Sequence, residues 1–431
     1  MPSERRDQMS TVELTENARK KQKTNSGIFR KLENITIFRE KLFVSGGFDI
    51  IYFILVIALL TTGLIMMASA SYVWGTFRNN DAYHYIKSQG LVAIVGVAAM
   101  LVISKINPQI IKKMAVLISI IGLLLLVLVL FYYKEIPDKP GIKRWMEIPF
   151  TSKTFQPSDV GKVAMIIGLA WGLEKGKKFL DTNILAPLLY FGVVAVVSLL
   201  VFAESHLSAF VMIFAMGIGM LFLSGMDRRW FILCGILGVI AIMIFFSIRH
   251  EILNEYQNAR IDSFFVKDYD DTDGRWQTNQ SLYALGSGGL FGLGLGNSIQ
   301  KYMYIPEPHN DFIFAIVGEE LGFFRAVLII ILFLALVARG FIIAERTKSM
   351  YERLVVLGIS LQVGIQSVLN ILVVTDMIPN TGISLPFFSF GGTALLILLA
   401  EMGLVLGISR TGSRKAKIRD DKMKEDKKDA E

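Results

Sequence analysis

Four carboxylates interrupt an otherwise apolar stretch of the chain, Tyr304–Gly322. They are Glu307, Asp311, Glu319 and Glu320, and a long apolar run begins directly after Asp311. A fixed carboxylate can act as a general base, and ionisable side chains inside membrane segments mark functional or paired sites. Because Asp is also favoured at helix N-termini, a capping role for Asp311 is the alternative. We expect at least one of Glu319 and Glu320 to point into the protein, since lipid contact is costly for both.

A second polar stretch, residues 141–165, combines cations with a carboxylate. Arg144 and Trp145 could cradle an anionic, partly apolar ligand, because Arg binds phosphate in a bidentate manner and Trp favours the membrane interface. The letters QPSD predict a helix start, which places Lys162 one turn after Asp159 on the same face. A lone Lys inside a membrane costs about 2.5–3.5 kcal/mol, so we expect it to pair with Asp159. A purely structural ion pair is the alternative.

Two further patches carry polar or helix-breaking residues. Glu204 and His206 stand in a tight turn that we expect to be solvated, and a metal site there would need partners that the sequence does not locate. Residues 378–396 contain two prolines and the pair Gly391–Gly392, with Asn370 shortly before them. Broken backbone at membrane depth is tolerated only inside protein or along a cavity, so this segment predicts a cavity wall.

The composition defines the class of protein. The chain has 431 residues, of which 53% are hydrophobic and 19% charged, and its mean hydropathy is +0.51. The apolar residues are bunched into runs of about 20, the length that crosses a hydrocarbon core of roughly 30 Å. We therefore predict an all-α, polytopic membrane protein. The polar, basic start predicts no cleavable signal peptide, and the single Cys234 excludes an intramolecular disulfide.

The apolar runs predict about ten transmembrane helices within a membrane domain, residues 48–408. A basic tail (1–47) precedes this domain and a charged tail (409–431) follows it. The fourth span is short and polar at its entrance, so hydropathy alone supports it least. The predicted spans are Phe48–Ala70, Tyr85–Ser104, Met114–Tyr132, Val160–Leu173, Ile184–Val201, Leu207–Ser224, Phe231–Ile248, Phe312–Val337, Leu354–Val374 and Leu385–Ile408.

Lys and Arg indicate the orientation. They gather in both tails and in alternate connections, near 112–113, 175–178, 228–229 and 339–353. The positive side faces the cytoplasm, so both termini are predicted inside and the large loop 249–311, between spans seven and eight, outside. The basic residues follow the membrane-flank pattern and no nucleic-acid module is present. We expect attraction to anionic membrane lipid and no nucleic acid.

The loop 249–311 is long enough to suggest a function. Glycines at 286, 288, 289, 292, 294 and 296 permit close backbone approach. The letters GLFGLG loosely resemble a nucleotide-binding loop, but no strand precedes them and GK[ST] is absent. Because the loop is also predicted outside the cell, where ATP is absent, we expect no nucleotide.

Three motifs together resemble the SEDS family (shape, elongation, division and sporulation). They are KRW…FQPSDVGK, QSLYALGSGGLFGLGLGNSIQKYMYIPEPHNDFIFAIVGEELG and PNTGISLPFFSFGGTALL, in order across residues 48–408. Within the family, SIQKYMYIPEPHNDFIFAIVGEE is more similar to the FtsW/SpoVE branch than to RodA. The resemblance implies a peptidoglycan glycosyltransferase that polymerises lipid II outside the cytoplasmic membrane. It also implies a class B penicillin-binding protein partner that cross-links the strands.

The resemblance also assigns residues, with some departures. The family's catalytic Asp falls on Asp311, and its QPSE-xx-K motif falls on Gln156–Lys162, where Asp159 replaces Glu and shortens the carboxylate by one methylene. The common PDLGTA reads ESHLSA here, so Glu204 is the acid available in that turn. We expect Asp311 to be catalytic and a set of polar side chains to bind substrate: Arg144, Trp145, Gln156, Asp159, Lys162, Gln280, Ser281, Lys301, Glu307, His309, Asn370, Thr381 and Ser389.

The expected mechanism is general-base catalysis. Asp311 would take the proton from the sugar 4-hydroxyl of one lipid II as that oxygen attacks the anomeric carbon of the growing strand. The leaving undecaprenyl diphosphate needs charge stabilisation, for which Arg144, Lys162, Lys301 and a divalent cation (Mg²⁺ or Mn²⁺) are candidates.

Two other functions remain open. A lipid II flippase would need polar groups through the whole membrane depth, whereas the sequence places them toward the outer side. A non-enzymatic scaffold of the division complex would need no catalytic carboxylate. In each case we expect a multi-pass protein of the cytoplasmic membrane, at the division septum with other division proteins. The sequence does not separate septation, elongation and sporulation.

Overall fold

The computed structural model describes residues 42–44, 46–134, 143–148, 154–253, 258, 261–262, 264–265, 274–380 and 382–428. Beyond residue 411 it describes the helix but not the side chains. Most of the N-terminal basic tail and the predicted substrate-binding residue Thr381 lie outside the described residues.

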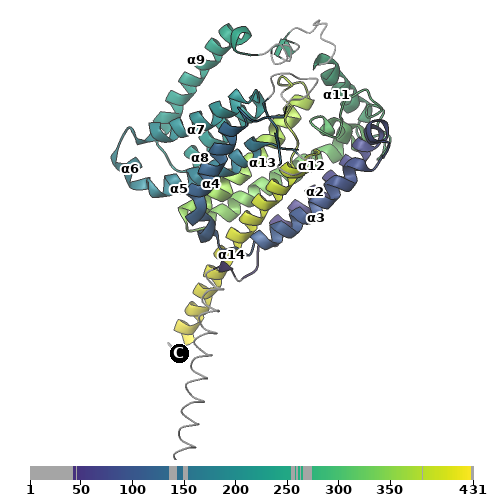
Figure 1. Cartoon of the computed structure of the whole chain (residues 1–431). Coiled ribbons are helices and arrows are strands. Elements are labelled where there is room, and N and C mark those ends of the chain that lie inside the picture. The colour runs from purple at the N-terminus through teal and green to yellow at the C-terminus, as the bar shows by residue number, and fades with distance from the viewer. Residues whose placement is uncertain are drawn as a thin grey trace, which may run out of the picture.

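In the described part of the chain, the protein is an all-α bundle with one short hairpin (Figure 1). The hairpin pairs β1 (Met146–Glu147) antiparallel with β2 (Thr154–Phe155). The helices are α2 (Ile50–Asn79), α3 (His84–Ile103), α4 (Pro108–Leu128), α5 (Pro157–Lys175), α6 (Lys177–Thr182), α7 (Ala186–Ala203), α8 (Leu207–Leu223), α9 (Arg228–Ile252), α11 (Gly274–Gly288), α12 (Ile313–Glu345), α13 (Met350–Val374) and α14 (Gly392–Lys428).

A helix occupies each of the ten predicted spans. In the described part of the chain, seven helices are long and apolar enough to cross a membrane: α2, α3, α7, α9, α12, α13 and the 392–411 part of α14. The apolar parts of α4 and α8 are shorter, and α5 begins with polar residues. The polytopic all-α class is therefore confirmed, while the number of spans stays a prediction.

One predicted boundary was wrong, for a local reason. The tenth span was expected from Leu385, but α14 begins only at Gly392, because Pro386 and the turn around Phe387, whose φ is +67°, interrupt the helix. The outer loop 249–311 also contains the regular helix α11.

Helix α13 lies at the centre of the bundle, and α9 lies at its edge. In α13, 61% of the most apolar stretch is buried and it packs against α5, α8, α12 and α14, whereas none of the corresponding stretch of α9 is buried. In Figure 1, α9 stands at the outer edge of the bundle. Apolar faces of this kind suit contact with lipid, where no water competes for the backbone.

Polar contacts join one set of helix ends. Arg339 near the end of α12 binds Asp49, the N-cap of α2, at 2.8 Å. Lys112 of α4 pairs with Glu174 of α5, and Gln109 at the start of α4 bonds to Glu352 of α13 at 2.6 Å. These are the ends that the Lys and Arg pattern assigns to the cytoplasm, so the contacts fit the alternation of ten spans.

Candidate functional site

Asp311 lies just before α12 and is half-buried. The N-cap of α12 is Phe312, which makes no side-chain cap hydrogen bond. Asp311 therefore does not occupy the N-cap position that the alternative assigned to it. Its backbone carbonyl accepts a hydrogen bond from Asn370 Nδ2 at 2.7 Å, so α13 fixes the position of this carboxylate residue.

The segment before Asp311 is bonded to the turn that precedes α14. Asn370 donates a second bond, to Ile383 O, at 2.7 Å. Ser389 Oγ donates to Asn310 O at 2.8 Å and accepts from Leu385 N at 2.7 Å. These bonds join three segments far apart in sequence and hold residues 309–311 against α13 and the 385–391 turn.

His309 belongs to the same junction. Its ring is 2% exposed, lies 4.2 Å between centroids from Tyr85, and contacts Phe390 edge-on. Its backbone carbonyl accepts a hydrogen bond from Phe390 N at 2.9 Å. Burial lowers the pKa of His309 to about 4. The imidazole is therefore neutral at physiological pH, and its visible role is packing beside Asp311.

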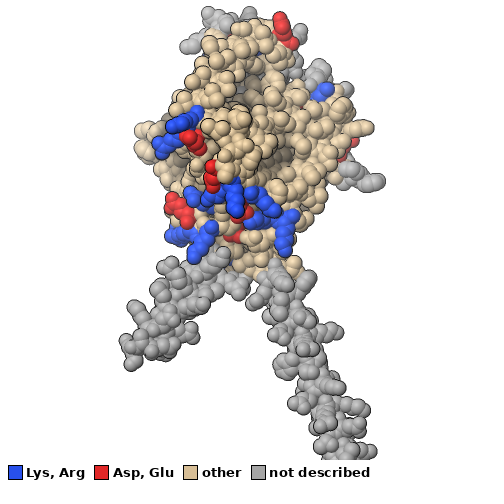
Figure 2. Space-filling view, turned by 90° about the vertical axis from the view of Figure 1, so that its left-hand side faces the viewer, with Lys and Arg blue, Asp and Glu red and all other residues tan. Residues whose placement is uncertain are grey.

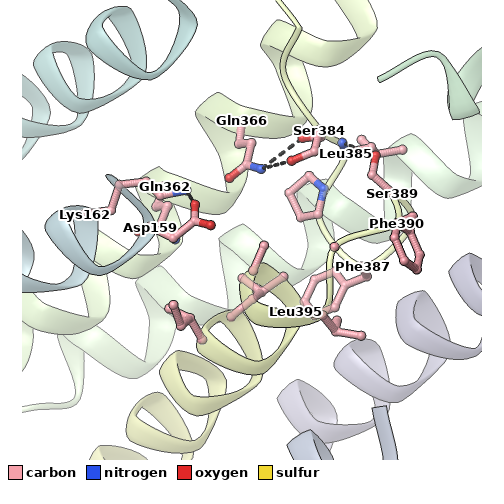
Figure 3. Close-up of a pocket in the computed structure, with 15 residues that line it drawn as sticks. Asp159, Lys162, Gln362, Gln366, Ser384, Leu385, Phe387, Ser389, Phe390 and Leu395 are labelled. Atoms are coloured by element: carbon pink, nitrogen blue, oxygen red, sulfur yellow. Dashed lines mark hydrogen bonds and ion pairs between the residues drawn. The ribbon is translucent and has the colours of Figure 1, made fainter. Parts of the chain in front are cut away.

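A small cavity lies beside this junction (Figure 3). Its volume is about 40 Å³, and Asp159, Lys162, Gln362, Gln366 and the 384–391 turn line it. Lys162 Nζ lies 2.7 Å from Asp159 Oδ1, which confirms the predicted pair. A water needs about 10–15 Å³ of such space, so the cavity has room for a few waters. Ser389 both lines the cavity and binds Asn310, which connects the ion pair to the Asp311 segment.

A second polar cluster lies around the turn between α7 and α8. Gln156 Nε2 is 2.8 Å from His206 Nδ1, and the Arg144 guanidinium donates to Ser205 O, with Nε at 3.1 Å. Glu204 is fully buried, and neither of its oxygens has a hydrogen-bond partner among the described residues. Burial raises the pKa of Glu204 to about 8. The expected solvated turn was therefore wrong, because Glu204 and His206 are both buried and Arg144 and Gln156 contact the turn.

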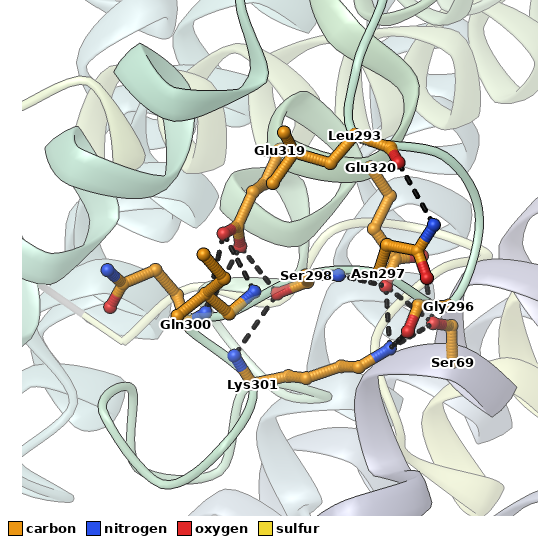
Figure 4. Close-up of polar contacts among 10 residues, drawn as sticks. Ser69, Leu293, Gly296, Asn297, Ser298, Gln300, Lys301, Glu319 and Glu320 are labelled. Atoms are coloured by element: carbon orange, nitrogen blue, oxygen red, sulfur yellow. Dashed lines mark hydrogen bonds and ion pairs between the residues drawn. The ribbon is translucent and has the colours of Figure 1, made fainter.

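Lys301 belongs to a different network (Figure 4). Its Nζ donates to Ser69 Oγ at 3.1 Å, to Gly296 O at 2.6 Å and to Glu320 Oε1 at 2.8 Å. A lysine ammonium has three donors, so none is left for a substrate phosphate. Lys301 is 3% exposed, and we do not assign it to the substrate site.

Glu319 and Glu320 are both fully buried, which confirms that at least one points inward. Glu319 accepts hydrogen bonds from Ser298 Oγ and from Ile299 N, the latter at 2.9 Å. Together with the Lys301 contacts, these bonds hold the glycine-rich segment against α12.

The other predicted residues lie around these clusters. Gln280 and Ser281 are buried on α11, and Ser281 donates to a backbone carbonyl at the end of α13 at 2.8 Å. Glu307 is exposed and accepts from Asn310 Nδ2 at 2.9 Å. Trp145 is half-buried beside the hairpin.

Sequence reasoning missed a buried pair in the middle of the bundle. Gln362 Nε2 donates to Glu401 Oε2 at 2.8 Å, and Glu401 is 3% exposed. Because Gln362 also lines the cavity, polar groups continue inward from Asp159 and Lys162. Polar groups therefore extend further inward than the sequence indicated. A Glu inside the tenth predicted span was a signal that could have found this pair.

The described residues do not build a resident metal site. No group of three or more His, Cys, Asp or Glu among them could hold an ion. Mg²⁺ is normally held by one or two carboxylates together with substrate phosphates. We therefore derive no catalytic step through a metal, and the expected divalent cation stays a prediction.

A family model described as "Cell cycle protein", for FtsW, RodA and SpoVE, matches residues 50–414. The chain belongs to the FtsW/RodA/SpoVE family of cell cycle proteins. This match covers the whole helical bundle, including the Asp311 junction and both polar clusters. It confirms the family that the three motifs indicated.

Curated relatives cover most of the chain. Stage V sporulation protein E of Bacillus subtilis is 37% identical over 366 residues, 84% of this chain and 97% of the relative. The probable peptidoglycan glycosyltransferase FtsW of Trichlorobacter lovleyi is 36% identical over 371 residues, 86% of this chain and 95% of the relative. These names agree with the predicted similarity to the FtsW/SpoVE branch.

Two solved structures share the fold. A chain from a study entitled "Structural coordination of polymerization and crosslinking by a peptidoglycan synthase complex" has a TM-score of 0.69 and 24% identity, over 85% of this chain and 98% of that one. Thermus thermophilus RodA, the rod shape determining protein, has a TM-score of 0.59 and 24% identity, over 84% and 97%.

Proposed function

We propose that this protein is a peptidoglycan glycosyltransferase that polymerises lipid II into glycan strands at the outer face of the cytoplasmic membrane. Family membership and the names of the curated relatives support this activity. The observation that carries it in this chain is Asp311, a half-buried carboxylate that lies one residue before the N-cap of α12 and whose segment is held by Asn370 and Ser389. A carboxylate fixed in this way suits a general base.

In the proposed reaction, Asp311 removes the proton from the 4-hydroxyl of an acceptor lipid II. The freed oxygen forms the new bond to the anomeric carbon of the growing strand, and the bond from that carbon to the diphosphate breaks. Undecaprenyl diphosphate leaves with the bonding electrons. Lys162 and Arg144, on the same side as Asp311, supply positive charge for the leaving group, whereas Lys301 is committed to Glu320.

The decisive test is lipid II polymerisation by the purified protein. Asp311→Asn should lower the rate on the order of 10²–10⁴-fold, because an amide cannot accept the proton. Its melting temperature should change little, because Asn keeps the size of Asp and one acceptor oxygen. The matched control is Asp81→Asn, an exposed outer residue paired with Lys87, which should keep its activity. A stable Asp311→Asn protein with near-normal chain formation would remove Asp311 from the chemical step.

The flippase and scaffold alternatives need separate tests. Detergent solution has no second compartment, so polymer formation by the purified protein there cannot be flipping. The buried Gln362–Glu401 pair extends the polar column inward, so the distribution of polar groups no longer argues against a flippase and the assay must decide. If Asp311→Asn cells grow normally and make septa, a scaffold is favoured. Activity lost with a chelator and restored by Mg²⁺ or Mn²⁺ would establish the proposed cation.

We further propose a class B penicillin-binding protein as partner and the division septum as location. The structural likeness to a chain of a peptidoglycan synthase complex supports a partner, and the FtsW and SpoVE names support a role in division or sporulation. Co-purification of a penicillin-binding transpeptidase tests the partner. A fluorescent fusion that stays evenly distributed in dividing cells would contradict the septal location.

A further inference from the structure

A second cavity lies at the opposite end of the bundle from Asp311. Its volume is about 200 Å³, and it is formed by the start of α6, the end of α8 and the α12–α13 connection. Three cationic side chains line it, Lys177, Lys348 and Arg353, together with the hydroxyl residues Ser224 and Thr347. The volume is several times what one water needs, so a small group can enter it.

The three cations have no partner among the residues that the structure describes. Within the described residues, the side chains of Lys177, Lys348 and Arg353 make no hydrogen bond and no ion pair. The neighbouring carboxylates are engaged elsewhere: Glu174 pairs with Lys112, and Glu352 accepts from Gln109. Like charges around one cavity repel each other, so an anion with several acceptor oxygens would lower the energy of this arrangement.

The surroundings of the cavity indicate where that anion comes from. Its lining includes apolar Leu223 and Leu354, and the adjacent Phe222 and the nearby Phe179 on α6 are 53% and 45% exposed. The cavity also lies beside the first turn of α13, where the helix dipole favours negative charge. Figure 2 shows Lys and Arg gathered low on this side of the molecule, below a largely uncharged surface.

We propose that this cavity binds the phosphate of an anionic phospholipid headgroup at the inner surface of the membrane. The phosphate oxygens contact the three cations Lys177, Lys348 and Arg353, and the phosphate also contacts Ser224 and Thr347. The acyl chains lie along the exposed phenylalanines of α6 and α8. Basic pockets between helices on the cytoplasmic side are suited to such headgroups. The bound lipid would stabilise the connection between α12 and α13. The opposite ends of these two helices hold the Asp311 junction.

The test uses full-length protein, delipidated in detergent, and native mass spectrometry with defined lipids. Phosphatidylglycerol should bind with one tight site, and phosphatidylcholine, whose headgroup has no net charge, should not. The variant Lys177→Gln/Lys348→Gln/Arg353→Gln should lose affinity on the order of 100-fold, since each basic residue near the surface contributes about 1 kcal/mol. The single variant Lys348→Gln should lose about fivefold in affinity on the same scale. It tests the site even if the triple variant does not fold.

The matched control removes three other cations from the same end, Lys113→Gln/Lys178→Gln/Arg229→Gln. These residues do not line the cavity, so binding should persist. Equal losses in both triple variants would show diffuse surface attraction and overturn the site. Equal binding of phosphatidylcholine would overturn the anionic specificity. If glycerol 3-phosphate or inorganic phosphate binds and phosphatidylglycerol does not, the cavity is a site for a soluble phosphate. That result would overturn the proposed lipid site.

Discussion

At the scale of single residues, two buried carboxylates of this protein lie in opposite surroundings. Lys301 and Glu320 satisfy each other within a dense set of hydrogen bonds. Glu204 is buried with no hydrogen-bond partner for its oxygens in the described part of the chain. Removing one partner of the Lys301–Glu320 pair should destabilise the protein, because a lone buried charge is left behind. Glu204 should instead make the stability depend on pH.

Lys301→Met should destabilise the protein by about 3–5 kcal/mol, because it leaves Glu320 buried without its cation. Lys301→Met/Glu320→Leu should recover part of this loss. Thermal unfolding in detergent measures both, and Lys87→Met, which removes an exposed ion pair, is the control with little expected change. A Lys301→Met protein of normal stability that no longer binds lipid II would instead return Lys301 to the substrate site.

Glu204 should make stability depend on pH. Its pKa is raised from 4.5 to about 8 in the folded protein, so the folded state binds more protons between these values. The free energy of unfolding that Glu204 contributes therefore falls as pH rises through that window, by at most about 1.4 kcal/mol per pH unit. Above the window this contribution is constant. Glu204→Gln should unfold at a higher temperature than the wild type at pH 9, with the difference shrinking toward pH 5. A difference independent of pH would contradict the buried acid.

At the scale of elements, α12 is interrupted at Gly322, whose φ is +78°. The glycine-rich segment enters this interruption: Phe323 N donates to Gly289 O at 2.9 Å, and Leu293 N donates to Glu319 O at 2.9 Å. A Cβ on Gly322 would lie 2.2 Å from Gly292 N. The segment that leads toward Asp311 is therefore anchored by backbone contact at positions where only glycine fits.

Gly322→Ala should cost more than about 2 kcal/mol, because it combines a strained dihedral with a backbone clash. Gly296→Ala is the matched control, since its φ is +86° but no atom lies within 4 Å of the added Cβ. That control should lose only about 1 kcal/mol. Unfolding temperatures and polymerisation rates measure both. Equal, small losses would mean that the segment does not depend on its insertion into α12.

At the scale of the whole molecule, the bundle has an apolar perimeter and two polar ends. The end with Asp49, Lys112 and Arg339 carries the cation-rich connections, and the other end carries Arg144, His206 and Asp311. This separation, together with the positive-inside pattern, predicts the orientation in the membrane.

The orientation can be checked with single cysteines in a Cys234→Ala background. Tyr302→Cys, at a side chain that is 57% exposed on the outer end, should react with an impermeant thiol reagent in intact cells. Lys113→Cys, exposed at the other end, should react only after the membrane is opened. The reverse pattern would place Asp311 in the cytoplasm and end the proposal of extracytoplasmic synthesis.

The sequence by itself determined the class, the placement of the helices and the grouping of their ends. Hydropathy and charge act over 20 consecutive residues, so lipid selects those features locally. The Asp159–Lys162 pair was also predictable, since residues three apart on a helix share a face. The motifs were sufficient to indicate the family.

Only the tertiary structure decided which distant groups meet. Lys301 lies 232 residues from Ser69, and Asn370 lies 59 residues from Asp311. Arg144 lies 61 residues from Ser205, which it contacts beside the buried Glu204. Such pairs depend on which helix faces pack together and on where α12 breaks. Hydropathy shows that a polar residue lies within an apolar segment, whereas the packing of the helices determines which partner it meets.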